Sequence, residues 1–234
     1  DALPISQVYL LTRENPSFKL LLFWILLSVT LCGIIWKLCG SDTYGILDSS
    51  YFIPRIYNLY FGKELYETFD FAYGPVLLYF PYFIYKIFST FSFEISDAYF
   101  LSLMFFQFVG LLFLYNIIGF FNITKKEKNY IFFIIALFSL PTNTGLNTIL
   151  FRFLLPLWCF IQLRQIEINP NRAIKYQFFI FSSSLLTLLT SPEAGIAFAV
   201  ATFLYLFFSF IFKKDYFYLI SIIVQVCSVG IVVL

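Results

Sequence analysis

Charged and aromatic residues that could carry out chemistry are concentrated in residues 41–97. The part from Asp48 to Pro75 reads DSSYFIPRIYNLYFGKELYETFDFAYGP. Asp48, Tyr51 and Arg55 stand at positions i, i+3 and i+7, so a helix here would place all three on one face. A carboxylate on such a face can serve as a general base. A nearby cation can stabilise negative charge that develops during a reaction.

The second half of this stretch places Asp70 and Tyr73 directly before Gly74 and Pro75. Glycine allows backbone geometry that other residues resist, and proline is well suited to the first turn of a helix. A helix start carries unpaired N–H groups and the positive end of the helix dipole, so it can face an anion. The alternative is an acidic, aromatic loop that simply lies at a membrane interface.

Two further charged residues stand in unusual surroundings. Arg152 lies within the apolar run TILFRFLLPLW, and Glu193 lies in the turn TSPEAG. An arginine inside a membrane is costly unless it is paired or faces water, so we expect Arg152 to face a cavity and to meet a carboxylate or a phosphate. The alternatives are that Arg152 snorkels from a helix start and that Glu193 belongs to a plain polar turn.

The composition excludes several kinds of site. The chain has no histidine, which removes His-based general bases, Ser-His-Asp triads and most zinc sites. The basic residues are scattered between apolar segments, so the net charge of +2 indicates no nucleic-acid partner. The four cysteines contain no CxxC pair, and we expect them to be packing residues. The acids leave a divalent metal open, but their spacing defines no ligand set and no definite cofactor.

The elements that carry these residues are strongly apolar. Of the 234 residues, 61% are hydrophobic and 12% are charged, whereas soluble domains have about 45–50% and about 25%. The mean hydropathy is +0.87. We therefore expect an all-α, polytopic membrane protein. The apolar runs expected to span the membrane are residues 20–36, 98–121, 130–140, 149–163, 177–189, 196–212 and 216–234.

The run at residues 75–91 decides the topology, because it is apolar but interrupted by Pro81 and Lys86. If this run spans the membrane, the basic segments at residues 125–128 and 164–175 fall outside, against the positive-inside rule. If it lies along the interface, these segments fall inside. We therefore expect about seven spans and a long first external loop, residues 41–97, that carries interfacial helices.

The domain organisation follows from the same pattern. Residues 1–234 are expected to form a single transmembrane domain. The opening residues 1–6, DALPIS, resemble the translated end of a sequencing adapter, and we expect them to be a non-native scar. The last residues stand inside an apolar run, so we expect the chain to be the N-terminal part of a longer protein.

Three motifs follow the first apolar run: D-x-x-Y-F from Asp48, G-K-x-L-Y from Gly62 and F-D-F-x-Y-G-P-x-x-x-Y from Phe69. Their order resembles that of the GT-C superfamily of membrane glycosyltransferases, of the dolichyl-phosphate-mannose mannosyltransferase and aminoarabinose-transferase type. The similarity covers roughly residues 20–212, and its specific part is residues 48–81. The resemblance implies a polyprenyl-phosphate-linked sugar donor, a lipid, glycan or protein acceptor, and interfacial helices in the first external loop.

The resemblance also implies roles for individual residues. The essential acid of the first external loop would be Asp48, with Asp42 as the rival, although the D-E pair common in relatives is Asp48-Ser49 here. A basic residue that meets the lipid phosphate would be Arg152, and the acid that follows a turn would be Glu193. Substrate binding is expected to involve Asp42, Tyr51, Arg55, Asp70, Tyr73, Arg152 and Glu193.

The expected function is therefore sugar transfer at the outer face of a multi-pass protein, in the bacterial inner membrane. Asp48 would take the proton of an acceptor hydroxyl, Arg152 would stabilise the departing phosphate, and attack from the opposite face would invert the anomeric carbon. One alternative is a lipid or sugar transporter or flippase, with the acids and Arg152 facing each other at mid-membrane. Another is a non-catalytic membrane assembly subunit.

Overall fold

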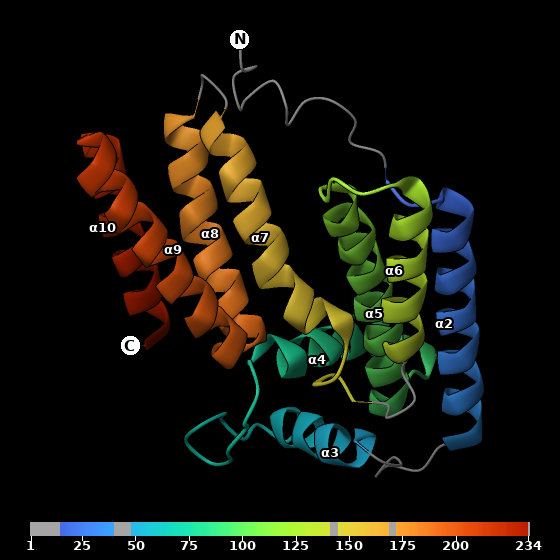
Figure 1. Ribbon diagram of the computed structural model, residues 1–234. Coiled ribbons are helices and arrows are strands. Elements are labelled where there is room, and N and C mark those ends of the chain that lie inside the picture. Colours follow the sequence, from blue (N-terminus) through green and yellow to red (C-terminus); the bar gives the residue numbers. More distant parts are fainter. Residues whose placement is uncertain (1–14, 40–47, 141–144, 169–171, 234) are drawn as a thin grey trace.

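Each apolar run that the sequence predicts as a span falls on a helix. The computed structural model describes residues 15–39, 48–140, 145–168 and 172–233, and this part of the chain is helical (Figure 1). Its long helices run side by side in alternating directions. They are α2 (Phe18–Cys39), α5 (Ile95–Gly119), α6 (Lys125–Phe138), α7 (Leu150–Ile168), α8 (Ala173–Thr190), α9 (Pro192–Lys213) and α10 (Tyr216–Val233).

Four of these helices are long and apolar enough to cross a membrane: Phe18–Leu38, Ile95–Gly119, Ala173–Thr190 and Pro192–Lys213. They are consistent with an integral membrane protein. Of the seven spans expected, four are thus candidate spans by length and composition, and the expectation of about seven is not confirmed. Helix α6 has 14 residues, which is about 21 Å at 1.5 Å per residue, against a hydrocarbon core of about 30 Å. Helix α7 ends in the polar sequence RQIEI, and α10 is apolar but shorter.

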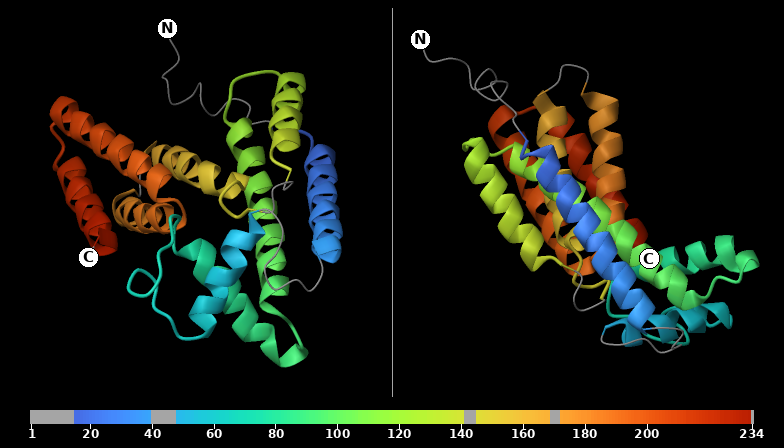
Figure 2. Two further views of the ribbon diagram at one scale, coloured as in Figure 1. Left: turned by 90° about the horizontal axis from the view of Figure 1, so that it is seen from below. Right: turned by 90° about the vertical axis from the view of Figure 1, so that its right-hand side faces the viewer.

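Two shorter helices lie across one end of this bundle. They are α3 (Ser49–Tyr60) and α4 (Val76–Phe88), and a 3-10 turn, Ser89–Phe91, follows α4. Figure 1 shows both transverse to the long helices, and Figure 2 shows them from two other sides at the same end. Pro75 is the N-cap of α4, as the Gly-Pro pair predicts. The chain thus enters α5 at the same end at which it leaves α2.

Aromatic and aliphatic side chains hold these transverse helices against the bundle. Phe52 of α3, Leu77 of α4 and Tyr99 of α5 are all 0% exposed and belong to one core cluster. The rings of Phe106 and Phe151 in the same cluster stack at 5.0 Å and join α5 to α7. The first loop is therefore part of the packed structure at this end of the bundle.

Gly74 is needed for a close approach and not for an unusual backbone angle. Among the described residues, Gly62 is the glycine with a positive φ, at 77°, so Gly74 does not use the left-handed backbone region that glycine allows. A Cβ atom on Gly74 would overlap the backbone of Leu189 and Thr190 at the end of α8. The first loop therefore rests directly on the α8–α9 turn.

The two ends of the bundle differ in charge. Helices α5, α7 and α9 end, and α6, α8 and α10 begin, at the end where α2 begins, and α3, α4 and the α8–α9 turn lie at the other end (Figure 1). We call these the basic end and the acidic end. Among the described residues, the basic end carries nine basic side chains against the acids Glu127, Glu167 and Asp215; the nine are Lys19, Lys125, Lys126, Lys128, Arg164, Arg172, Lys175, Lys213 and Lys214. The acidic end carries seven acids against the bases Lys37, Arg55, Lys63, Lys86 and Arg152; the seven are Asp48, Glu64, Glu67, Asp70, Glu94, Asp97 and Glu193.

Candidate functional site

Asp48 stands at the start of α3 and is half-buried. It is the N-cap residue of the helix, but its side chain caps no backbone N–H. The carboxylate instead reaches the segment that precedes α7, where a Cβ on Gly145 would collide with it. The acid predicted as the base therefore lies where the first loop meets the segment before α7.

Tyr51 and Arg55 lie on one face of α3, as their spacing predicts. The Arg55 guanidinium lies 3.5 Å from the centre of the Tyr51 ring, a cation–π contact. Its Nη1 donates to the Tyr51 carbonyl at 2.7 Å, and its Nε donates to the Asp70 carbonyl at 3.4 Å. Arg55 thus holds the Asp70 backbone against α3, while the Asp70 residue is exposed.

Tyr73 connects the first loop to α7. Its ring meets the Tyr51 ring edge to face at 5.7 Å, and its hydroxyl accepts a hydrogen bond from the Asn147 side-chain amide at 3.2 Å. On the same ring, the Arg152 guanidinium lies 4.9 Å from the centre. Tyr73 therefore contacts predicted site residues from two parts of the chain that are far apart in sequence.

Arg152 is buried and bonded through three different nitrogens. Its Nε donates to the Ser191 hydroxyl at 3.1 Å and its Nη1 to the Asn147 carbonyl at 2.8 Å. Its Nη2 donates to the Glu193 carboxylate at 2.5 Å. The Arg152 side chain is 8% exposed and that of Glu193 is 67% exposed. The expected meeting with an anion thus takes place within the chain, and an incoming phosphate would have to displace the exposed Glu193.

Two residues of the site were not predicted from the sequence. Gly145 and Asn147 belong to the segment PTNTGLN, which by sequence is only a polar connection between two apolar runs. The Asn147 Oδ1 also lies where a Cβ on Gly145 would stand. This oxygen is buried, and within the described ranges no donor reaches it. A carboxylate oxygen and an amide oxygen thus both pack against Gly145, and they leave no room for a larger residue there unless one of them moves.

The structure therefore joins most of the predicted site residues. Asp48, Tyr51, Tyr73, Arg152 and Glu193 form one series of contacts at the acidic end, and Arg55 joins it through Tyr51. Asp70 contributes its backbone carbonyl. Asp42 lies outside the described residues.

The remaining acids of the described residues are not grouped as the ligands of a metal ion. Across the described ranges no group of three or more His, Cys, Asp or Glu side chains is placed to hold a metal ion. Glu94 and Asp97 instead form a capping box at the start of α5, and Asp97 also accepts a hydrogen bond from Trp36 at 2.9 Å.

Comparisons with protein-family models, with curated proteins and with solved structures found no match for the chain. Its function is therefore inferred from its own residues and their arrangement.

Proposed function

We propose that the protein is a membrane glycosyltransferase that moves a sugar from a polyprenyl-phosphate donor to a hydroxyl of a lipid, glycan or protein acceptor. The supporting observation is the joint position of Asp48 and Arg152. A carboxylate from the first loop and a cation from α7 lie at one end of the bundle, joined through Tyr73, Asn147 and Gly145. Sugar transfer from a lipid phosphate needs these two kinds of group.

The acceptor half of the reaction belongs to Asp48. Its carboxylate takes the proton of the acceptor hydroxyl as the hydroxyl oxygen forms a bond to the anomeric carbon of the sugar. The bond from that carbon to the phosphate oxygen breaks, and its electron pair leaves with the lipid phosphate. Attack opposite to the phosphate inverts the anomeric carbon.

The donor half of the reaction belongs to Arg152. The guanidinium is already held by Ser191 and by the Asn147 carbonyl, so it is oriented before any substrate arrives. Glu193 is the exposed member of the ion pair, and the donor phosphate replaces it on Nη2. Arg152 then stabilises the charge that grows on the departing phosphate. Arg55 of α3, whose guanidinium lies over the Tyr51 ring, offers a second cation.

The proposed topology has seven crossings by α2 and α5 to α10, with α3 and α4 at the outer interface of the bacterial cytoplasmic membrane. The charge difference between the two ends supports it, because basic segments stay inside. Short helices such as α6 are tolerated where they border a cavity within the protein.

The position of the ion pair favours the enzyme over the transporter alternative. Arg152 is the third residue of α7, and Glu193 is the second residue of α9. The pair thus lies in the first turns of two helices at the acidic end. A central transport site would be built halfway along the helices, near the bilayer midplane.

The substitution Asp48→Asn tests the proposal, because it keeps the shape of the side chain and removes the base. Purified protein in liposomes would be supplied with a panel of polyprenyl-phosphate sugars and membrane extracts, and radiolabelled product would be counted. We expect transfer to fall by about 10²- to 10⁴-fold, the usual contribution of a general base. The matched control is Glu67→Gln, because Glu67 is an exposed acid of the same loop, and this variant should keep transfer. Unchanged transfer by Asp48→Asn would remove Asp48 as the base.

A further inference from the structure

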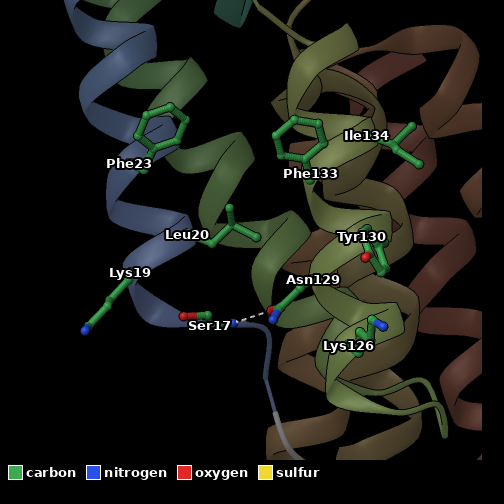
Figure 3. A pocket seen from close by; sticks show the side chains of 9 residues that line it. All are labelled: Ser17, Lys19, Leu20, Phe23, Lys126, Asn129, Tyr130, Phe133 and Ile134. Atoms are coloured by element: carbon green, nitrogen blue, oxygen red, sulfur yellow. Dashed lines mark hydrogen bonds between the residues drawn. The ribbon is translucent and has the colours of Figure 1, made fainter.

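A groove lies between α2 and α6 at the basic end, away from the site just described. It has a volume of about 820 Å³ and is lined by Ser17, Lys19, Leu20, Phe23, Lys126, Asn129, Tyr130, Phe133 and Ile134. In Figure 3 these side chains come from two facing helices. The groove is open to the surroundings of the bundle, because Phe23, Phe133 and Ile134 are 53%, 43% and 51% exposed.

One part of the groove is an apolar wall that packing within the protein holds in place. The ring of Phe133 meets the buried ring of Trp24 edge to face at 5.4 Å, and Phe23 meets Trp24 in the same way at 5.5 Å. Trp24 is 2% exposed, so both exposed rings are held in place by a fixed neighbour. Such a wall suits an aliphatic chain, which buries apolar surface without needing hydrogen bonds.

The other part of the groove is a cationic mouth. Figure 3 shows Lys19 and Lys126 at the end where the Ser17 N–H donates to the Asn129 Oδ1, a hydrogen bond of 2.7 Å that ties the start of α2 to α6. A second pocket, of about 450 Å³, adjoins this mouth through Ser17 and Lys19 and adds Lys125. The neighbouring acid, Glu127, is already engaged by Thr124 in the capping box of α6.

We propose that this groove binds one anionic phospholipid from the leaflet at the basic end. Its head group lies at the mouth, where Lys19 of α2 and Lys126 of α6 extend to opposite sides in Figure 3 and supply positive charge from both helices. One acyl chain lies along Leu20, Phe23, Phe133 and Ile134. The groove combines a cationic mouth with an apolar wall, and an anionic phospholipid has a matching group for each. A free phosphate would use only the lysines, and a zwitterionic lipid would use mainly the wall. Basic pockets between membrane helices on the inner side suit anionic head groups for this reason.

The proposal is independent of the proposed sugar transfer, because the groove and the Asp48 site lie at opposite ends of the bundle. The test is native mass spectrometry of the purified protein with equal amounts of phosphatidylglycerol and phosphatidylcholine. We expect one retained phosphatidylglycerol and a preference of roughly thirtyfold, since each lysine near an anionic head group contributes a several-fold gain.

The double variant Lys19→Gln/Lys126→Gln should lose this preference. The matched control is Lys175→Gln/Lys214→Gln, which removes two charges from the same end but from other helices, and it should keep the preference. A third variant, Ile134→Trp, fills the groove and leaves both lysines, so it should lower retention of the lipid.

Three results would overturn the proposal. The first is equal retention of the two lipids by the unchanged protein. The second is a preference that survives the double variant or disappears in the control, since either would assign the effect to general charge. The third is displacement of the lipid by millimolar inorganic phosphate together with full retention by Ile134→Trp, which would indicate a simple anion site.

Discussion

Arg152 donates through three nitrogens to Ser191, Asn147 and Glu193, so it joins the start of α7 to the start of α9. Removing the buried guanidinium would leave the buried Ser191 hydroxyl without its donor, and an unsatisfied buried polar group costs about 1–3 kcal/mol. A loss of activity in an Arg152 variant would therefore mix a structural effect with a chemical one. Gly145 offers a second probe of the same site, because its substitution keeps the Arg152 guanidinium and its bonds to Ser191 and Glu193.

The substitution Gly145→Ala should disturb the base without unfolding the protein. The new Cβ would meet the carboxylate oxygen and the Cβ of Asp48 and the amide oxygen of Asn147. The two oxygens are ends of side chains that can turn away, and the Asp48 Cβ needs a small shift at the start of α3. We expect transfer to fall at least about tenfold, since misplacing a reacting group by about 1 Å can cost a hundredfold. The control is Gly230→Ala, where a Cβ would meet open space. Equal activity of the two variants would contradict the geometry proposed for Asp48.

A second residue-scale feature is Glu167 at the basic end, beyond the apolar run of α7. It is 4% exposed and accepts hydrogen bonds from Tyr205 and Tyr218. It also accepts from Lys213 at 2.9 Å and from Arg164 at 2.6 Å. Burial alone would raise the pKa of Glu167, but these four donors outweigh it and lower the pKa to about 2.

The lowered pKa of Glu167 predicts a pH dependence of stability. Because the folded pKa lies below the unfolded value near 4.5, the stabilisation is complete above about pH 4.5. It is lost as the pH falls toward 2. We expect Glu167→Gln to lower the thermal unfolding temperature in detergent at pH 7, and we expect the gap from the unchanged protein to narrow between pH 4.5 and 3. Glu64→Gln, at an exposed site, should show no such gap. A gap of equal size at pH 7 and pH 3 would contradict the prediction.

At the scale of elements, the first loop is placed by its contact with the α8–α9 turn. The close approach of Gly74 to Leu189 and Thr190 brings Tyr73 beside Arg152. The next element, α4, begins directly after its N-cap residue Pro75 and packs against α5. The position of the site thus depends on the contact between a loop and a turn that lie more than a hundred residues apart in the chain.

The substitution Gly74→Ala should weaken this contact. A Cβ at Gly74 would overlap backbone atoms of Leu189 and Thr190, which cannot swing aside as a side chain can. We expect a loss of about 1–3 kcal/mol in the free energy of unfolding, the usual cost of overpacking. Thermal unfolding in detergent measures it, with Gly230→Ala as the control for adding a methyl group. A Gly74→Ala variant as stable as this control would show that the loop does not need the close approach.

At the scale of the whole molecule, the transverse position of α4 decides on which side every later segment lies. If α4 does not cross the membrane, Lys63 in the first loop and Lys175 at the start of α8 face opposite sides. If α4 crosses, both face the same side. Both residues are exposed, so single cysteines placed there can report on their location.

Single cysteines at Lys63 and Lys175, in a variant without the four native cysteines, test this topology. A membrane-impermeant maleimide should label Lys63→Cys in intact cells and Lys175→Cys only after the cells are opened. We expect this result because the positive-inside rule keeps the basic segment that contains Lys175 in the cytoplasm. Labelling of both positions in intact cells would mean that α4 crosses the membrane.

Local features of the sequence were sufficient for much of the architecture. Runs of apolar residues predicted the positions of α2 and α5 to α10. The pair Gly74-Pro75 predicted the start of α4, and the spacing of Tyr51 and Arg55 predicted their shared face. These features depend on residues within one or two helical turns of one another, so composition and periodicity are enough to find them.

The sequence by itself therefore determined an all-helical chain, the separation of basic from acidic segments, and a set of charged candidates that includes Asp48 and Arg152. Only the tertiary structure decided that Glu193, 41 positions away, is the partner of Arg152. It also decided that Gly145 and Asn147 meet Asp48, and that Gly74 serves a close approach. Such contacts arise where separate helices pack against each other, and the packing depends on the shapes of both surfaces at once. No local pattern in either segment contains that information.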